Sequence, residues 1–144
     1  MRVARRAILA AMATATPRSS RAVVVDSHLH VWSSSHPYAK GGEPPAALGD
    51  AVASAAALET SMASANIDAA LIVQPINYRF DHAHVASVLK AAPQRYRGMA
   101  LADPTAADPG AALREACASA PGLWTGVRFN PHDRRRRHLG ETKP

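Results

Sequence analysis

Cysteine is almost absent from this 144-residue chain, and so are long apolar runs. Cys117 is the only cysteine, so no disulfide can form within the chain, and a reducing or redox-indifferent compartment is expected. Its alanine-rich surroundings favour a small packed residue over a nucleophile. No stretch reaches the roughly 18 consecutive apolar residues that cross a bilayer, so no membrane segment is predicted.

A basic binding surface is also missing, although the formal net charge is +6. Residues 1–25 carry five arginines and no acid, and residues 131–144 have a net charge of +3. The stretch between them has a net charge of −2. Nucleic acid is therefore rejected as the main partner, and a localisation or RNA-contact role for the arginines at 134–137 is a weak alternative.

Residues 1–22 have the composition of a targeting presequence, being rich in Arg, Ala, Ser and Thr without an acid. They predict import into a mitochondrion or chloroplast, with the cytoplasm as the alternative. A secretory signal over residues 7–13 is a weaker rival, because Arg18 and Arg21 follow it. We therefore expect a disordered presequence at 1–22, a folded domain at 23–130 and a disordered basic tail at 131–144.

A run of three valines at residues 23–25 predicts a buried parallel strand. The run leads into Asp26, His28 and His30, which strand alternation places on one face. Two imidazoles at this spacing can bind one divalent metal ion, with zinc as the first candidate. The alternatives are a metal-free site and ordinary loop histidines, because an H-x-H spacing alone is a weak motif.

The rest of the chain alternates short apolar runs with helical patterns. Strands are predicted at 69–73, 97–102 and 124–129, helices at 46–66, 81–92 and 109–120, and a lid-like loop at 33–45. Spacing of about 30 residues per unit is typical of parallel βαβ units in an α/β fold, either a doubly wound sheet or a barrel. No glycine-rich phosphate loop follows the first strand, so a dinucleotide site is not expected.

Polar side chains follow each predicted strand, at the end where parallel α/β folds bind ligands. The candidates are His28 and His30 as metal ligands, and Gln74, Arg128 and Asn130 as substrate-binding residues, with Asp103 at the remaining strand end. The guanidinium of Arg128 suits a carboxylate, which it can bind through two hydrogen bonds. The alternative is that Arg128 pairs with a neighbouring acid.

Four sequence blocks together resemble a known family. D-S-H-L-H-V-W, I-D-A-A-L-I-V-Q, Y-R-G-M-A-L-A-D-P and T-G-V-R-F-N follow in order and are similar to the amidohydrolase-2 family, the 2-pyrone-4,6-dicarboxylate lactonase-like hydrolases. The resemblance implies a TIM barrel that hydrolyses a small lactone or carboxylated ring compound, with decarboxylation in related families. It also implies that His28 and His30 line the metal or substrate site and that Arg128 faces the substrate carboxylate.

A complete barrel has eight strands and typically about 250 residues, whereas four strands are predicted here. We therefore expect the N-terminal half of the barrel, with the general base elsewhere and no hydrolase turnover by this chain alone. One hypothesis is a fragment of such a hydrolase. The other is a non-catalytic half-barrel that binds a partner or self-associates through its open sheet edges.

Overall fold

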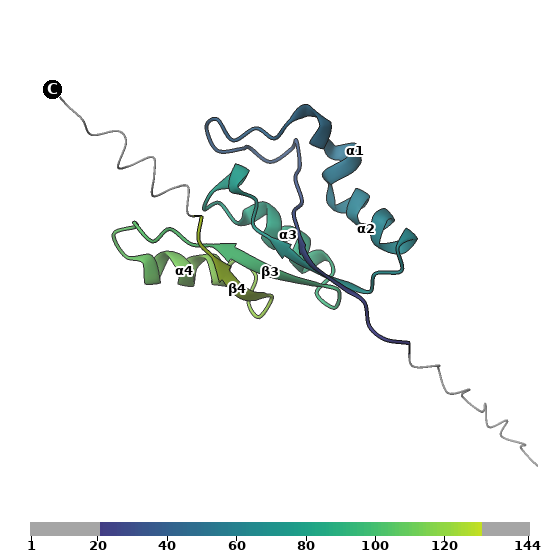
Figure 1. The fold of residues 1–144 in the computed structure, drawn as a ribbon. Helices are drawn as coiled ribbons and strands as arrows, with labels where there is room; N and C mark the ends of the chain where they lie inside the picture. Colours follow the sequence, from purple (N-terminus) through teal and green to yellow (C-terminus); the bar gives the residue numbers. More distant parts are fainter. Residues whose placement is uncertain (1–20, 131–144) are drawn as a thin grey trace, which may run out of the picture.

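The computed structural model describes residues 21–130, which form a parallel four-stranded sheet (Figure 1). Its strands, in the spatial order β1-β2-β3-β4, are β1 (Val25–Leu29), β2 (Ala69–Val73), β3 (Tyr96–Leu101) and β4 (Trp124–Arg128). The predicted α/β fold of four barrel-type strand–helix units is confirmed. The sequential strand order favours part of a barrel over a doubly wound sheet, in which the order reverses.

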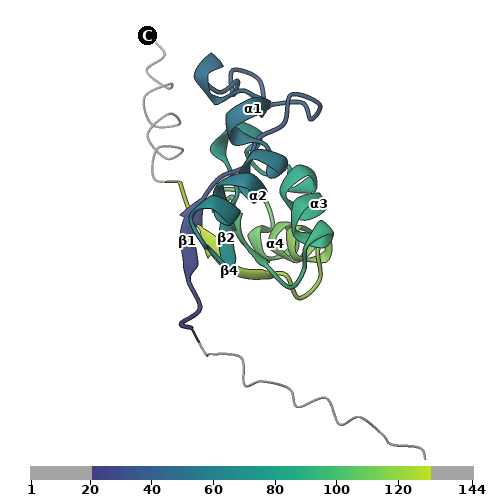
Figure 2. The same cartoon turned by 90° about the vertical axis from the view of Figure 1, so that its right-hand side faces the viewer.

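The helices between the strands lie on one side of the sheet (Figure 2). They are α1 (Asp50–Ala53), α2 (Ala55–Ser64), α3 (Ala83–Ala91) and α4 (Pro109–Ala118), with short 3-10 turns η1 (Ala46–Leu48) and η2 (Ile76–Tyr78). None of the helices within residues 21–130 is long and apolar enough to span a bilayer. Apart from Arg21 and Ala22, the predicted presequence lies outside the described residues, as does the predicted tail, so organelle targeting stays a prediction.

The prediction of one continuous helix over residues 46–66 was wrong. The chain breaks at Ser54, whose extended backbone (φ −75°, ψ 167°) cannot continue α1. The Ser54 hydroxyl instead accepts a hydrogen bond from the Ala57 N–H at 3.2 Å and so caps the start of α2. Only the second part of the predicted apolar stripe therefore packs inward: Met62 is buried, whereas Val52 is exposed.

The hydrophobic core lies between the sheet and α2 and α3. Leu29 and Trp124 are partly buried and pack against this core. Its buried residues are Val31, Met62, Ala70, Ile72, Val85, Ala86, Val88, Leu89, Tyr96 and Ala120. As predicted, Val85, Val88 and Leu89 form the inner side of α3. Within residues 21–130 no helix covers the other side of the sheet (Figure 2).

The valine run before β1 is exposed, which corrects the prediction of a buried strand. Val23 is 74% exposed and Val25 is 53% exposed. The reason is that β1 is an edge strand, and its core contacts come from Leu29 and the following Val31. The register with β2 also shifts between Asp26 and Leu29, and the Asp26 carboxylate accepts the His28 N–H at 3.0 Å, so the predicted strict alternation is broken.

The other edge of the sheet also exposes apolar side chains, with Phe129 after β4 being 61% exposed. Edge strands with free backbone groups and apolar side chains favour pairing with another chain. Self-association stays a prediction, which sedimentation velocity at rising protein concentration can test.

Cys117 is exposed rather than packed as expected, because α4 turns the adjacent Ala116 toward the interior.

Gly98 in β3 marks the closest contact between the sheet and its helix layer. A Cβ atom at Gly98 would lie 2.4 Å from Cε3 of Trp124 and 2.6 Å from Cδ1 of Leu89. Both neighbours belong to the packed core and have little room to move. The position therefore requires a residue without a side chain.

We expect Gly98→Ala to lower the free energy of unfolding by about 1–3 kcal/mol, because the added methyl group overpacks the core. Urea unfolding followed by circular dichroism measures this change. Gly49→Ala is the matched control, since a Cβ there would lie an ordinary 3.6 Å from its nearest neighbour, the Ala46 oxygen. Equal stabilities of the two variants would contradict this account of Gly98.

His82 is a buried core residue whose protonation should affect the stability of the fold. Its side chain is buried, and its ring lies edge-on to Trp124 at 5.4 Å between centroids. The Nε2 atom accepts the Leu101 N–H at 3.2 Å, so protonation of Nε2 would remove that hydrogen bond. Burial lowers the pKa of His82 below its usual 6.5.

Because the folded state keeps His82 neutral, the unfolded chain binds more protons as the pH falls below about 6.5. Stability should therefore be greatest above pH 6.5 and should fall toward pH 5. We expect His82→Gln to reduce this slope, by at most about 1.4 kcal/mol per pH unit. Urea unfolding at pH 7.5, 6.5 and 5.5 measures the slope, and an unchanged slope in the variant would refute this role of His82.

Candidate functional site

The end of β1 brings the two candidate metal ligands together. The rings of His28 and His30 lie 5.3 Å apart between centroids, in an edge-to-face arrangement with an 84° angle between planes. His28 is exposed and His30 is half-buried. Both imidazoles therefore reach the same space at the carboxyl end of the sheet.

His30 is held in one orientation by the neighbouring strand. Its Nδ1 atom lies 2.8 Å from the backbone oxygen of Val73, the last residue of β2. Because a carbonyl oxygen only accepts hydrogen bonds, Nδ1 carries the proton and Nε2 keeps its lone pair. Burial lowers the pKa of His30, the hydrogen bond to the Val73 oxygen partly opposes this effect, and the nearby charges of Arg128 and His28 lower the pKa further. The ring is thus kept in the neutral form that can bind a metal or accept a proton.

Arg128 comes from the opposite edge of the sheet. It ends β4, beside Leu101 in the register, and its positive charge lowers the pKa of His30, which follows β1. An electrostatic effect between the two outermost strands agrees with the curvature of a barrel sheet. No acidic side chain among residues 21–130 forms an ion pair with Arg128. That part of the chain therefore gives no support to the alternative in which Arg128 pairs with a neighbouring acid.

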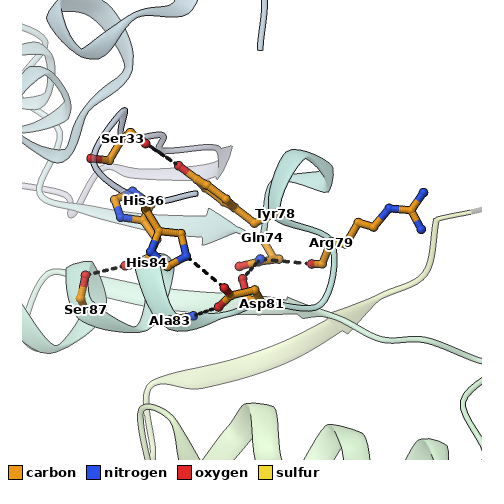
Figure 3. Close-up of polar contacts among 9 residues, drawn as sticks. All are labelled: Ser33, His36, Gln74, Tyr78, Arg79, Asp81, Ala83, His84 and Ser87. Carbon is orange, nitrogen blue, oxygen red and sulfur yellow. Dashed lines mark hydrogen bonds and ion pairs between the residues drawn. The ribbon is translucent and has the colours of Figure 1, made fainter. Parts of the chain in front are cut away.

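Gln74 is in a different environment from these three residues. Its side chain is fully buried, and its amide group donates hydrogen bonds to the backbone oxygens of Arg79 at 3.2 Å and Asp81 at 2.7 Å (Figure 3). These bonds hold the segment between β2 and α3. The placement gives Gln74 a structural task, and its contact with substrate stays a prediction.

The remaining polar strand ends differ in their burial, because Asn130 is buried and Asp103 is half-buried. Asn130 is buried two residues after Arg128, and its role in substrate binding stays a prediction. The carboxylate of Asp103 accepts hydrogen bonds from the backbone N–H and the hydroxyl of Thr105, at 2.8 and 2.6 Å. Asp103 thus stabilises the turn that follows β3.

A polar and aromatic cluster beside the site was not predicted. The imidazole of His36 lies 3.2 Å from the Asp81 carboxylate, with its centroid 5.2 Å from that of Tyr78 and 5.7 Å from that of His84 (Figure 3). Burial and the neighbouring His36 lower the pKa of His84. Tyr78, Asp81 and His84 lie close together in the sequence, but His36, which contacts all three, comes from a loop more than 40 residues earlier.

A cavity of about 410 Å³ lies between the start of α3, the end of β3 and α4. It is lined by residues 80–83 and 101–103 and by one side of α4. His28, His30 and Arg128 do not line this cavity. The cavity is therefore separate from the candidate site.

Within residues 21–130, no three His, Cys, Asp or Glu side chains lie close enough together to hold a metal ion.

Comparison with known proteins agrees with the fold described above. Among solved structures, the chain is similar to a probable 2-pyrone-4,6-dicarboxylic acid hydrolase from Acinetobacter baumannii with citric acid bound, at a TM-score of 0.59 and 20% sequence identity. The match covers 76% of this chain and 38% of that chain, so the present chain spans less than half the length of its neighbour. A likeness at this identity shows the fold.

A search among curated proteins finds no match. The model of the amidohydrolase family, Amidohydro_2, matches residues 25–142 and so includes all four strands together with His28, His30 and Arg128. Because this match covers most of the sequence, the chain belongs to the amidohydrolase family.

Proposed function

We propose that the site serves the hydrolysis of a small lactone or a related carboxylated ring compound. The observation that carries the proposal is the pairing of the His28 and His30 rings at the end of β1, with Arg128 close enough at the end of β4 for its charge to lower the pKa of His30. The planar guanidinium of Arg128 forms no ion pair with an acidic side chain in residues 21–130, so it is suited to bind a carboxylate of a ligand. The citric acid bound to the similar structure is a carboxylate ligand of that protein and supports the same chemistry.

His28 and His30 would hold a divalent metal, for which zinc is our first candidate. The fit is good for His30, since its bond to the Val73 oxygen leaves Nε2 free as a ligand atom. Zinc sites use three or four protein ligands, so further ligands would come from outside residues 21–130. A bound metal would supply an activated water or polarise the substrate carbonyl.

The other steps fall to the side chains themselves. Arg128 would bind a carboxylate of the substrate and so orient its ring toward the imidazoles. Burial of His30 would keep its ring neutral while substrate binds. We place the general base, like the further metal ligands, outside residues 21–130.

Zinc titration of the full chain tests the proposed ligands. After chelator treatment, zinc is added in competition with a chromophoric chelator, and we expect His28→Asn and His30→Asn each to weaken binding more than about tenfold. His36→Asn is the matched control, because it removes an imidazole that lies in the neighbouring cluster. We expect its zinc affinity to equal that of the wild type.

Two outcomes would count against the assignment. Wild-type affinity in both His28→Asn and His30→Asn would remove these residues from the metal site. An equal loss in His36→Asn would show that the zinc contacts are not confined to the end of β1. Circular dichroism of each variant checks that the fold is retained.

A further inference from the structure

Asn77, in the short η2 turn after β2, joins three separate points of the chain. Its side-chain Oδ1 accepts the indole N–H of Trp32 at 2.9 Å, and its Nδ2 donates to the backbone oxygen of Gly42 at 2.6 Å. Its backbone oxygen accepts the N–H of Ala39 at 2.9 Å. One residue thus fastens the loop at 33–45 on both sides of Lys40.

Trp32 connects this junction to the candidate site. It follows His30 by two residues, and the two rings lie 5.5 Å apart between centroids with a 64° angle between planes. The backbone N–H of Trp32 donates to the Ala53 oxygen at 2.9 Å, which fixes the start of the side chain against α1. The bond to Asn77 fixes its other end, so the indole has one position beside His30.

The contact between Asn77 and the loop is tightly packed. A Cβ atom at Gly42 would lie 2.5 Å from the Asn77 backbone oxygen and 2.8 Å from the Ala39 oxygen. Only glycine allows the two backbone segments to approach so closely. The local backbone is therefore built around Asn77.

We propose that Asn77 is a positioning residue for the candidate site. It holds Trp32 as a fixed wall beside His30 and keeps residues 39–42 closed over the turn after β2. In this view the loop at 33–45 is a permanent part of the site, rather than the swinging lid that its composition suggests. The inference rests on the proposed function only in assigning the site that Trp32 borders.

The first part of the loop is held independently of Asn77. The Tyr78 hydroxyl accepts the Ser33 N–H at 2.8 Å, and His36 pairs with Asp81 (Figure 3). Tyr38 stacks on the Tyr78 ring at 5.0 Å between centroids. These contacts do not involve the Asn77 side chain. Removal of the Asn77 side chain should therefore release Trp32 and the backbone at Gly42, while residues 33–38 and the backbone bond between Ala39 and Asn77 stay in place.

Trypsin tests the release of the loop, because Lys40 is exposed and lies between the two attachment points. In the full chain we expect Asn77→Ala to raise the rate of cleavage after Lys40 about tenfold, since the hydrogen bond that holds Gly42 is lost. Mass spectrometry of the fragments separates this cut from cuts elsewhere. Gln94→Ala, which removes an exposed amide, is the control and should cleave like the wild type.

Tryptophan fluorescence tests the position of Trp32. In a Trp124→Phe background Trp32 is the only tryptophan, and Asn77→Ala should increase its quenching by acrylamide. Asn77→Asp keeps an acceptor for the indole N–H but loses the donor to Gly42. We therefore expect Asn77→Asp to speed cleavage after Lys40 while leaving the quenching of Trp32 unchanged, a separation that general unfolding would not produce.

Binding of 2-pyrone-4,6-dicarboxylate, measured by calorimetry, tests whether the contacts of Asn77 affect the candidate site. We expect Asn77→Ala and Trp32→Phe to weaken binding of this probe, and the double variant to bind no more weakly than Asn77→Ala alone. A wild-type chain that does not bind the probe would overturn the proposed function. Wild-type cleavage and quenching in Asn77→Ala would overturn the role of Asn77, whatever the probe does.

Discussion

The hydrogen bond between His30 Nδ1 and the Val73 oxygen is the interaction on which the candidate site depends. It joins the ends of β1 and β2, sets the tautomer of His30 and leaves the lone pair on Nε2. Without this bond the imidazole would be free to rotate. Burial and the charge of Arg128 would still lower the pKa of His30, but neither ring nitrogen would be held in one position. The parallel sheet supplies this bond because neighbouring strands end side by side.

The strands were the most predictable elements, since short apolar runs bounded by polar residues have few other solutions. β2 was predicted at the residues where it occurs, and the inner side of α3 followed from its apolar spacing. The exposure of Val23 could not be predicted, because the sequence pattern of a strand does not say whether it lies at an edge. Likewise, a serine can either cap a new helix or lie within a continuous one. Tertiary packing decides which of the two occurs at Ser54.

The candidate site was predictable in its chemistry and less so in its arrangement. His28 and His30 could be paired from local spacing, and Arg128 from its place at a strand end. The direction of a polar side chain after a strand depends on the next turn, and the turn after β2 draws Gln74 inward. Contacts of Asn77 with Trp32 and Gly42 join residues more than 30 positions apart, so no local pattern reports them.

We propose that His30, which follows β1, and Arg128, which ends β4, contact the same bound carboxylate ligand. Nitrogen-15 NMR of the histidine rings and arginine Nε groups, during titration with 2-pyrone-4,6-dicarboxylate, tests it directly. The account predicts that His30 and Arg128 shift together with one dissociation constant, while the buried His82 does not respond. Shifts at His82 without shifts at Arg128 and His30 would contradict the account.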